Sequence, residues 1–182
     1  YLSLHLAFYL ASWGMYRGSS FLLQKDYKVL SPVVEEVLKP EYDCLFGVAC
    51  ADLREPEVQV MLTKLYDYIA DYFRPIRDEV AGCEVASSVS PVLVTKILMG
   101  TLGCVPAYDR FFQDGVATHK VTTQEYSLKS VLRLVDFYEE HNDRLEETRR
   151  GMQCEDLTYP QMKVLDMGFW QVGFEKDTGS AK

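Results

Sequence analysis

Apolar residues recur every three to four positions over most of this chain, and this periodicity constrains its fold more than any other feature. Between residues 55 and 80 the apolar positions follow i, i+3, i+4 spacing, which predicts one long amphipathic helix. Pro75 is expected to kink that helix or to end it at Arg74. Alternation of apolar and polar residues is nearly absent, and residues 117–122 are only a weak strand candidate. The sequence therefore predicts an all-α protein.

Two segments, residues 2–16 and 91–102, are apolar on nearly all sides. A helix that is apolar all round is normally buried, so we expect both to be central helices. Gly115 and Gly173 are expected to end helices, because glycine is common just past a helix end. We predict a single compact domain of roughly seven to nine helices over residues 1–174, followed by a frayed tail at 175–182.

Capping signals indicate where helices begin. Ser90-Pro91 combines an N-cap serine with proline at the first helical position. Thr122 and Glu125 have the spacing of a capping box, which predicts a helix running from there to about residue 150. Ser19 or Ser20 is expected to cap a shorter helix after the first one.

The chain is acidic, and this bounds its partners. It has 182 residues and a formal net charge of −8, with carboxylates in both halves. Proteins that bind duplex DNA usually present a basic face, because neutralisation of phosphates dominates their affinity. We therefore expect no direct binding to duplex DNA, and we expect a protein partner, with a basic nucleic-acid-binding protein as one such class. The sequence leaves the oligomeric state open.

Cysteine and histidine usage indicates location and metal content. The five cysteines include no C-x-x-C pair, and the three histidines are scattered. This usage is typical of reduced thiols in a cytoplasmic protein and predicts no metal site. No phosphate-binding glycine motif ends in Gly-Lys-Ser/Thr, so no cofactor is expected. The apolar start of the chain is too short to span a bilayer, which predicts no membrane association.

Lys96 and Asp109 are the candidate catalytic residues. A lysine inside an apolar helix loses solvation and can become a neutral nucleophile, and a nearby aspartate can take a proton or hold the amine. The order of a core lysine followed by Val-Pro-x-x-Asp loosely resembles the helix-hairpin-helix DNA glycosylases. That resemblance covers about residues 90–112 and implies that Lys96 attacks a sugar carbon while Asp109 assists. The alternative is a structural ion pair between the two.

Arg17, Ser19 and Ser20 form a candidate anion-binding turn. The arginine and the free N–H groups of the helix that follows suit a phosphate or carboxylate. The alternative is a tight helix corner in which Arg17 pairs with a carboxylate.

Asp166 and Trp170 are further candidate binding residues in the last helix, and they share one helix side with Lys163. A buried carboxylate needs a partner, so Asp166 is expected to form an ion pair with Arg17 or Lys96 across the core. The alternative is a structural helix anchored by its tryptophan.

Three blocks of sequence carry a resemblance that covers roughly a third of the chain: ASWGMYRGSSFLLQK, VTKILMGTLGCVPAYDRFF and YPQMKVLDMGFWQVGF. On these blocks the chain is similar to a family of uncharacterised, mostly bacterial, all-helical proteins. The resemblance implies membership of that family and brings no activity with it.

Two main functional hypotheses follow. The favoured one is an intracellular, acidic, helical protein-binding module, with an inhibitor or antagonist of a nucleic-acid-binding or defence protein as one form of it. The alternative is a DNA-processing enzyme of glycosylase or lyase type that uses Lys96 and Asp109. A phosphate- or nucleotide-responsive switch at Arg17 is a third hypothesis.

Overall fold

The computed structural model describes residues 1–17, 20–81 and 89–179, and within them every regular element is a helix. The prediction of an all-α protein is thus confirmed. The α-helices are α1 (Leu2–Ser12), α2 (Ser31–Val37), α3 (Pro56–Ala81), α4 (Pro91–Thr101), α5 (Arg110–Thr118), α6 (Leu128–Glu140), α7 (Asn142–Gly151) and α8 (Gln161–Thr178). Four short 3₁₀ helices join them: η1 (Phe21–Gln24), η2 (Tyr27–Leu30), η3 (Pro40–Leu45) and η4 (Ala51–Arg54).

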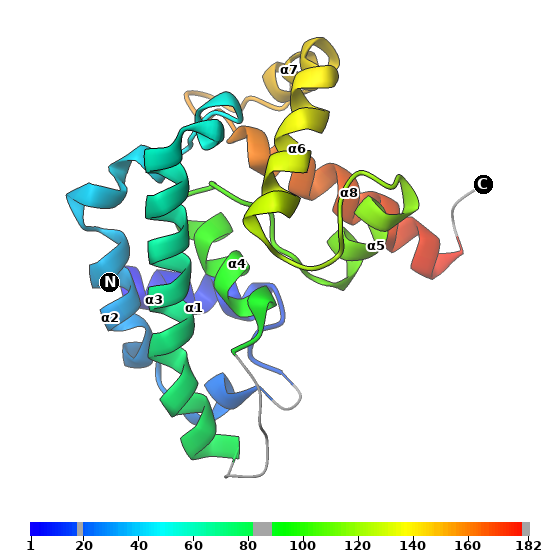
Figure 1. Ribbon diagram of the computed structural model, residues 1–182. Helices are drawn as coiled ribbons and strands as arrows, with labels where there is room; N and C mark the ends of the chain where they lie inside the picture. Colours follow the sequence, from blue (N-terminus) through cyan, green and yellow to red (C-terminus); the bar gives the residue numbers. More distant parts are fainter. Residues whose placement is uncertain (18–19, 82–88, 180–182) are drawn as a thin grey trace.

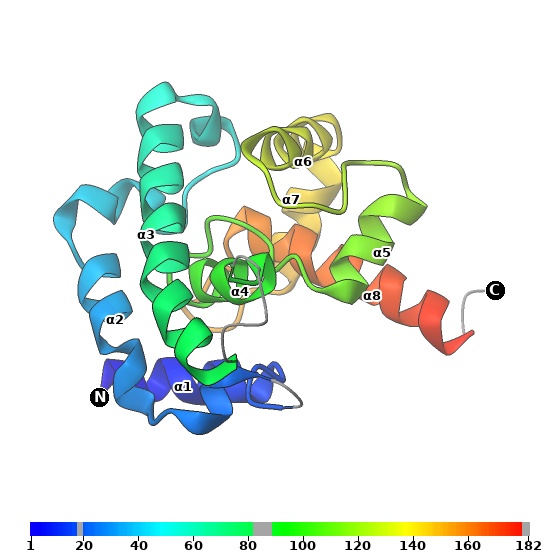
Figure 2. The ribbon, with the colours of Figure 1, turned by 60° about the horizontal axis from the view of Figure 1, so that its bottom comes forward.

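Helix α4 lies at the centre of the molecule. Figures 1 and 2 show it between α1, α2 and α3 on one side and α5, α6 and α8 on the other. All its side chains from Leu93 to Met99 are buried, and the Ser90 side chain caps its first turn, as predicted. The core packs around this helix.

Helix α1 departs from the expectation of a second central helix. Only Leu6 and Leu10 are buried, whereas Phe8 is 68% exposed. One side of α1 packs on the core, and its opposite apolar side faces outward. The length of an apolar run does not reveal which neighbours will cover it.

Helices α5 and α8 pack with their backbones in contact. A Cβ atom on Gly115 would overlap the carbonyl oxygen of Phe169, and one on Gly173 would overlap that of Phe111. Both glycines lie inside helices and end neither, so the predictions for them were wrong. Their small size serves the close approach of the two helices.

Helix α6 begins later than predicted. Ser127 is its N-cap and accepts a hydrogen bond from the N–H of Ser130, whereas Thr122 is not a cap. The Thr122 hydroxyl is buried and lies 3.0 Å from the Ser130 hydroxyl, which in turn lies 2.7 Å from that of Tyr108. The chain then breaks at His141, so the single predicted helix is two, α6 and α7.

Helix α3 has the extent predicted for the long helix over residues 55–80, whereas the end of α8 differs from expectation. Helix α3 continues through Pro75, which does not end it. Helix α8 runs to Thr178 and ends at Gly179, whose φ of 68° is left-handed. The predicted frayed tail therefore begins as helix, and residues 180–182 lie outside the described part of the chain. Among the described helices, none is both long and apolar enough to cross a membrane.

Candidate functional site

Lys96 and Asp109 meet in the structure, as the sequence predicted. Lys96 is 5% exposed on α4, and its Nζ lies 3.2 Å from Oδ2 of Asp109. The same Nζ donates a 2.9 Å hydrogen bond to the carbonyl oxygen of Trp13 and lies 5.7 Å from the centroid of that residue's ring. These neighbours are acceptors and an aromatic face, and all of them suit a charged ammonium group.

Asp109 is fixed from two directions. It is the N-cap of α5, where its Oδ1 accepts a 3.2 Å hydrogen bond from the N–H of Phe112. The preceding residue, Tyr108, donates its N–H to the hydroxyl of Thr95, which directly precedes Lys96 on α4. The Asp109 carboxylate therefore both starts a helix and holds the lysine.

Asp166 is buried and has partners other than those predicted. Its Oδ2 lies 2.7 Å from Nζ of Lys163, and its Oδ1 accepts a 2.9 Å hydrogen bond from the N–H of Ala107. Burial raises the pKa of Asp166, and the ammonium of Lys163 opposes this increase. Asp166 thus forms its ion pair with Lys163 of the same helix, and not with Arg17 or Lys96 across the core as predicted.

A hollow of about 840 Å³ reaches the Lys96–Asp109 pair, and we call it the Lys96 hollow. Four predicted site residues line it, namely Arg17, Lys96, Asp109 and Trp170, whereas Asp166 does not. Its walls come from the end of α1 with the segment after it, from α4, from the start of α5 and from α8. The full lining is Ala11, Ser12, Trp13, Gly14, Met15, Tyr16, Arg17, Val92, Lys96, Asp109, Arg110, Phe111 and Trp170.

Arg17 folds back over Gly14 at one wall of this hollow. Gly14 has φ of 74°, and a Cβ atom there would lie 2.8 Å from Nε of Arg17. No ion pair of Arg17 occurs within the described residues. Ser20 serves η1 as its N-cap and accepts a 3.3 Å hydrogen bond from the N–H of Leu22. Ser19 lies outside the described residues.

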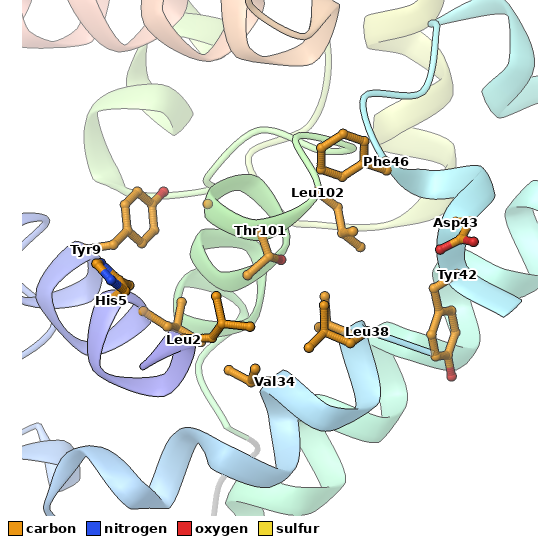
Figure 3. A pocket seen from close by; sticks show the side chains of 13 residues that line it. Leu2, His5, Tyr9, Val34, Leu38, Tyr42, Asp43, Phe46, Thr101 and Leu102 are labelled. Carbon is orange, nitrogen blue, oxygen red and sulfur yellow. The ribbon is translucent and has the colours of Figure 1, made fainter. Parts of the chain in front are cut away.

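A second depression, the apolar groove, was missed by the sequence analysis. It has a volume of about 460 Å³ and lies between α1, α2, η3 and the end of α4 (Figure 3). Figure 3 shows Leu2 of α1, Leu38 at the C-terminal end of α2 and Leu102 facing a common space. The groove is lined by Leu2, His5, Leu6, Tyr9, Val34, Val37, Leu38, Tyr42, Asp43, Phe46, Gly100, Thr101 and Leu102.

Large apolar side chains stand exposed at the groove. Leu38 is 61% exposed and Phe46 is 74% exposed. Phe46 is held there because the N–H of the next residue, Gly47, donates a 2.7 Å hydrogen bond to the carbonyl oxygen of Leu102. In the sequence these residues look like ordinary core positions, so only the structure identifies the groove.

Nothing in the described residues points to a metal site, and no cysteine is among the residues that line either depression. The part of the chain that is described holds no group of three His, Cys, Asp or Glu side chains suited to a metal ion. Burial raises the pKa of Cys50 and of Cys104 to about 12, so these thiols are poor nucleophiles at neutral pH.

No protein-family model matches this chain, and no curated protein and no solved structure is similar enough to count as a match. The similarity to a bacterial all-helical family stays a prediction that rests on the three sequence blocks. The two depressions are therefore the features of the molecule from which a function can be inferred.

Proposed function

We propose that this chain is an acidic, helical protein-binding module whose apolar groove takes an amphipathic segment of a basic partner. The observation that carries the proposal is the groove itself, with Leu38 and Phe46 exposed at its edge. Contiguous exposed apolar surface is unusual on a protein without a partner and is typical of an interaction site.

The shape of the groove suits an amphipathic helix. An amphipathic helix can lay its apolar face into an apolar groove, with anchors that recur at i, i+3, i+4 and i+7. Leu2 and Leu38 lie on opposite sides of the space, and Leu102 lies on the Leu38 side (Figure 3). A partner leucine entering this space would contribute about 2 kcal/mol through burial of apolar surface.

Charge at the groove favours a basic partner. Four carboxylates lie between residues 31 and 46; Glu36 pairs with Lys39 and Glu41 with Lys64, which leaves Glu35 and Asp43 without an ion pair among the described residues. Asp43 lines the groove, and within the described residues it forms no ion pair. A lysine or arginine beside the partner's apolar anchors would form an ion pair with the Asp43 carboxylate.

The class of partner follows from that complementarity. Nucleic-acid-binding proteins present basic segments that normally meet phosphates. The chain would act as an inhibitor or antagonist of such a protein by placing carboxylates and an apolar groove against that segment.

The experiment is a binding titration with two labelled amphipathic peptides that share one leucine face and differ in the charge of the polar face. We expect the lysine-rich peptide to bind and the glutamate-rich peptide to bind at least tenfold more weakly. Leu38→Asn should weaken binding of the lysine-rich peptide about tenfold or more without adding charge, since the loss of one buried leucine is worth about 2 kcal/mol. Leu157→Asn is the matched control, because Leu157 is 63% exposed and lies outside the groove. Equal binding by both variants would refute the proposal.

A second candidate function, the DNA-processing enzyme, is favoured by one observation: the Lys96 hollow reaches Lys96 and Asp109. In that reaction the Lys96 ammonium gives a proton to Asp109, and the free amine attacks the C1′ aldehyde of an abasic sugar, losing water to form an imine. Borohydride would reduce the imine to a stable covalent adduct. An adduct with wild type and none with Lys96→Met would support this function. No adduct with folded wild type would exclude it.

A further inference from the structure

The Lys96 hollow carries positive charge in an acidic protein. Its lining holds three cationic side chains, Arg17, Lys96 and Arg110, and one carboxylate, Asp109, a net of +2 in a chain of net charge −8. Arg110 also pairs with Asp177 at 2.6 Å outside the lining. With Asp177 included the balance is still positive. Positive charge gathered in a concave site attracts an anion.

Two of these cations have N–H donors without a hydrogen-bond partner among the described residues. Within the described residues the Lys96 ammonium uses two N–H donors, one for the Trp13 carbonyl and one for Asp109, and an ammonium has three. Arg17 is exposed, and none of its side-chain donors has a hydrogen-bond partner there. A bound anion would therefore accept hydrogen bonds from the buried Lys96 ammonium and from the exposed Arg17 guanidinium.

Aromatic rings complete the hollow. Trp13, Tyr16, Phe111 and Trp170 line it, and the Trp170 and Phe111 rings pack edge to face at an interplanar angle of 74°, with centroids 5.1 Å apart. Trp13 is partly exposed, and its ring already accepts the Lys96 and Lys163 ammonium groups. Such rings offer faces and edges to a planar ligand. The volume of about 840 Å³ lies within the range of small-molecule sites.

We propose that the Lys96 hollow binds a nucleoside phosphate, with the phosphate on Arg17 and Lys96 and the base among the aromatic side chains. The hollow lies at the C-terminal end of α1 and the groove borders its N-terminal half, so this inference does not rest on the protein-binding proposal. It concerns binding alone and stands whether or not Lys96 reacts.

Intrinsic fluorescence is the direct assay, because the chain has two tryptophans and both line the hollow. The probes are adenosine monophosphate, adenosine, inorganic phosphate and a 5′-phosphorylated single-stranded oligonucleotide. We expect saturable quenching by the monophosphate and at least tenfold weaker binding of adenosine and of phosphate alone. A strand that binds at least tenfold tighter than the monophosphate assigns the ligand to a nucleic-acid end. Equal or weaker binding of the strand assigns it to a free nucleotide.

Variants locate the site. Arg17→Ala, at an exposed position, should weaken binding of the monophosphate about tenfold or more, since a charge-assisted hydrogen bond is lost. Arg133→Ala removes an exposed arginine outside the hollow and should leave binding unchanged. Lys96→Met tests the buried donor, with circular dichroism as its folding control. The inference is overturned if folded wild type shows no saturable quenching at millimolar concentration, or if Arg17→Ala binds as wild type does.

Discussion

Gly173 offers the sharpest test of how α8 packs against α5. An alanine at this position would place its Cβ within the carbonyl group of Phe111, closer than non-bonded atoms approach. Gly168 lies in the same helix, and no atom lies within 4 Å of the place where its Cβ would stand. The two substitutions have the same chemistry and differ only in their surroundings.

The two substitutions are expected to change the free energy of unfolding in opposite directions. In an exposed helix interior, alanine is about 0.5–1 kcal/mol more favourable than glycine, so Gly168→Ala should stabilise the protein by that amount. Gly173→Ala gains the same propensity but forces the helix backbones apart. Overpacking of this kind costs about 1–3 kcal/mol, occasionally more, and here the obstacle is backbone, which cannot move aside alone. We expect a net loss of about 2 kcal/mol.

Urea unfolding followed by circular dichroism at 222 nm measures both changes. With a slope of roughly 1–3 kcal/mol per molar urea, the two midpoints should move in opposite directions by several tenths of a molar unit or more. The packing of α5 on α8 would be refuted if Gly173→Ala were as stable as Gly168→Ala. The same result would remove the support that brings Trp170 to the Lys96 hollow.

Three further experiments test local features of the structure. The Tyr16 hydroxyl is buried without a hydrogen-bond partner in the described part, so Tyr16→Phe should raise the free energy of unfolding by up to about 1 kcal/mol, and a clear loss in urea unfolding would contradict this. In a double-mutant cycle of Lys96→Met and Asp109→Asn, we expect a coupling of about 1–3 kcal/mol, and additivity would disprove the ion pair. Burial alone would raise the pKa of Glu146, but hydrogen bonds, the strongest from Arg149, lower it overall. A lowered pKa stabilises the fold above the ordinary value of 4.5, and this contribution is lost as the pH falls through the lowered one. Glu146→Gln should therefore flatten the acid limb of a stability profile, and an unchanged limb would refute this.

Much of the fold was predictable because local signals and burial agree. Helix α4 has a serine cap, a proline at its first position and apolar residues all round, and each of these signals survives in the structure. Gly115 and Gly173 show where local reasoning fails. A glycine past a helix end and a glycine under a crossing backbone look the same until the partner helix is known.

The candidate site shows a similar division. Arg17, Lys96, Asp109 and Trp170 were each identified from the sequence, and the structure brings them to one hollow. Their convergence depends on how α1, α4, α5 and α8 pack, which no single segment specifies. Asp166 was correctly expected to be buried and paired, but its partner lies one helical turn away rather than across the core.

The apolar groove could not be predicted, because the exposure of an apolar residue is a property of the whole fold. Phe46 follows a 3₁₀ helix in a short apolar stretch and looks like a core residue. In the structure it is 74% exposed, since the adjoining Gly47 is tied to Leu102 and turns the chain there.

Amide chemical-shift mapping with the lysine-rich amphipathic peptide tests the central claim, that the apolar groove is a protein-binding site. The account predicts saturable shifts at Gly100 and Thr101, which line the groove, and at Gly47, which directly follows the lining residue Phe46, and none at Gly168 on α8. Binding that shifts Gly168 and leaves the three groove amides unchanged, or no saturable shift at any amide, would contradict it.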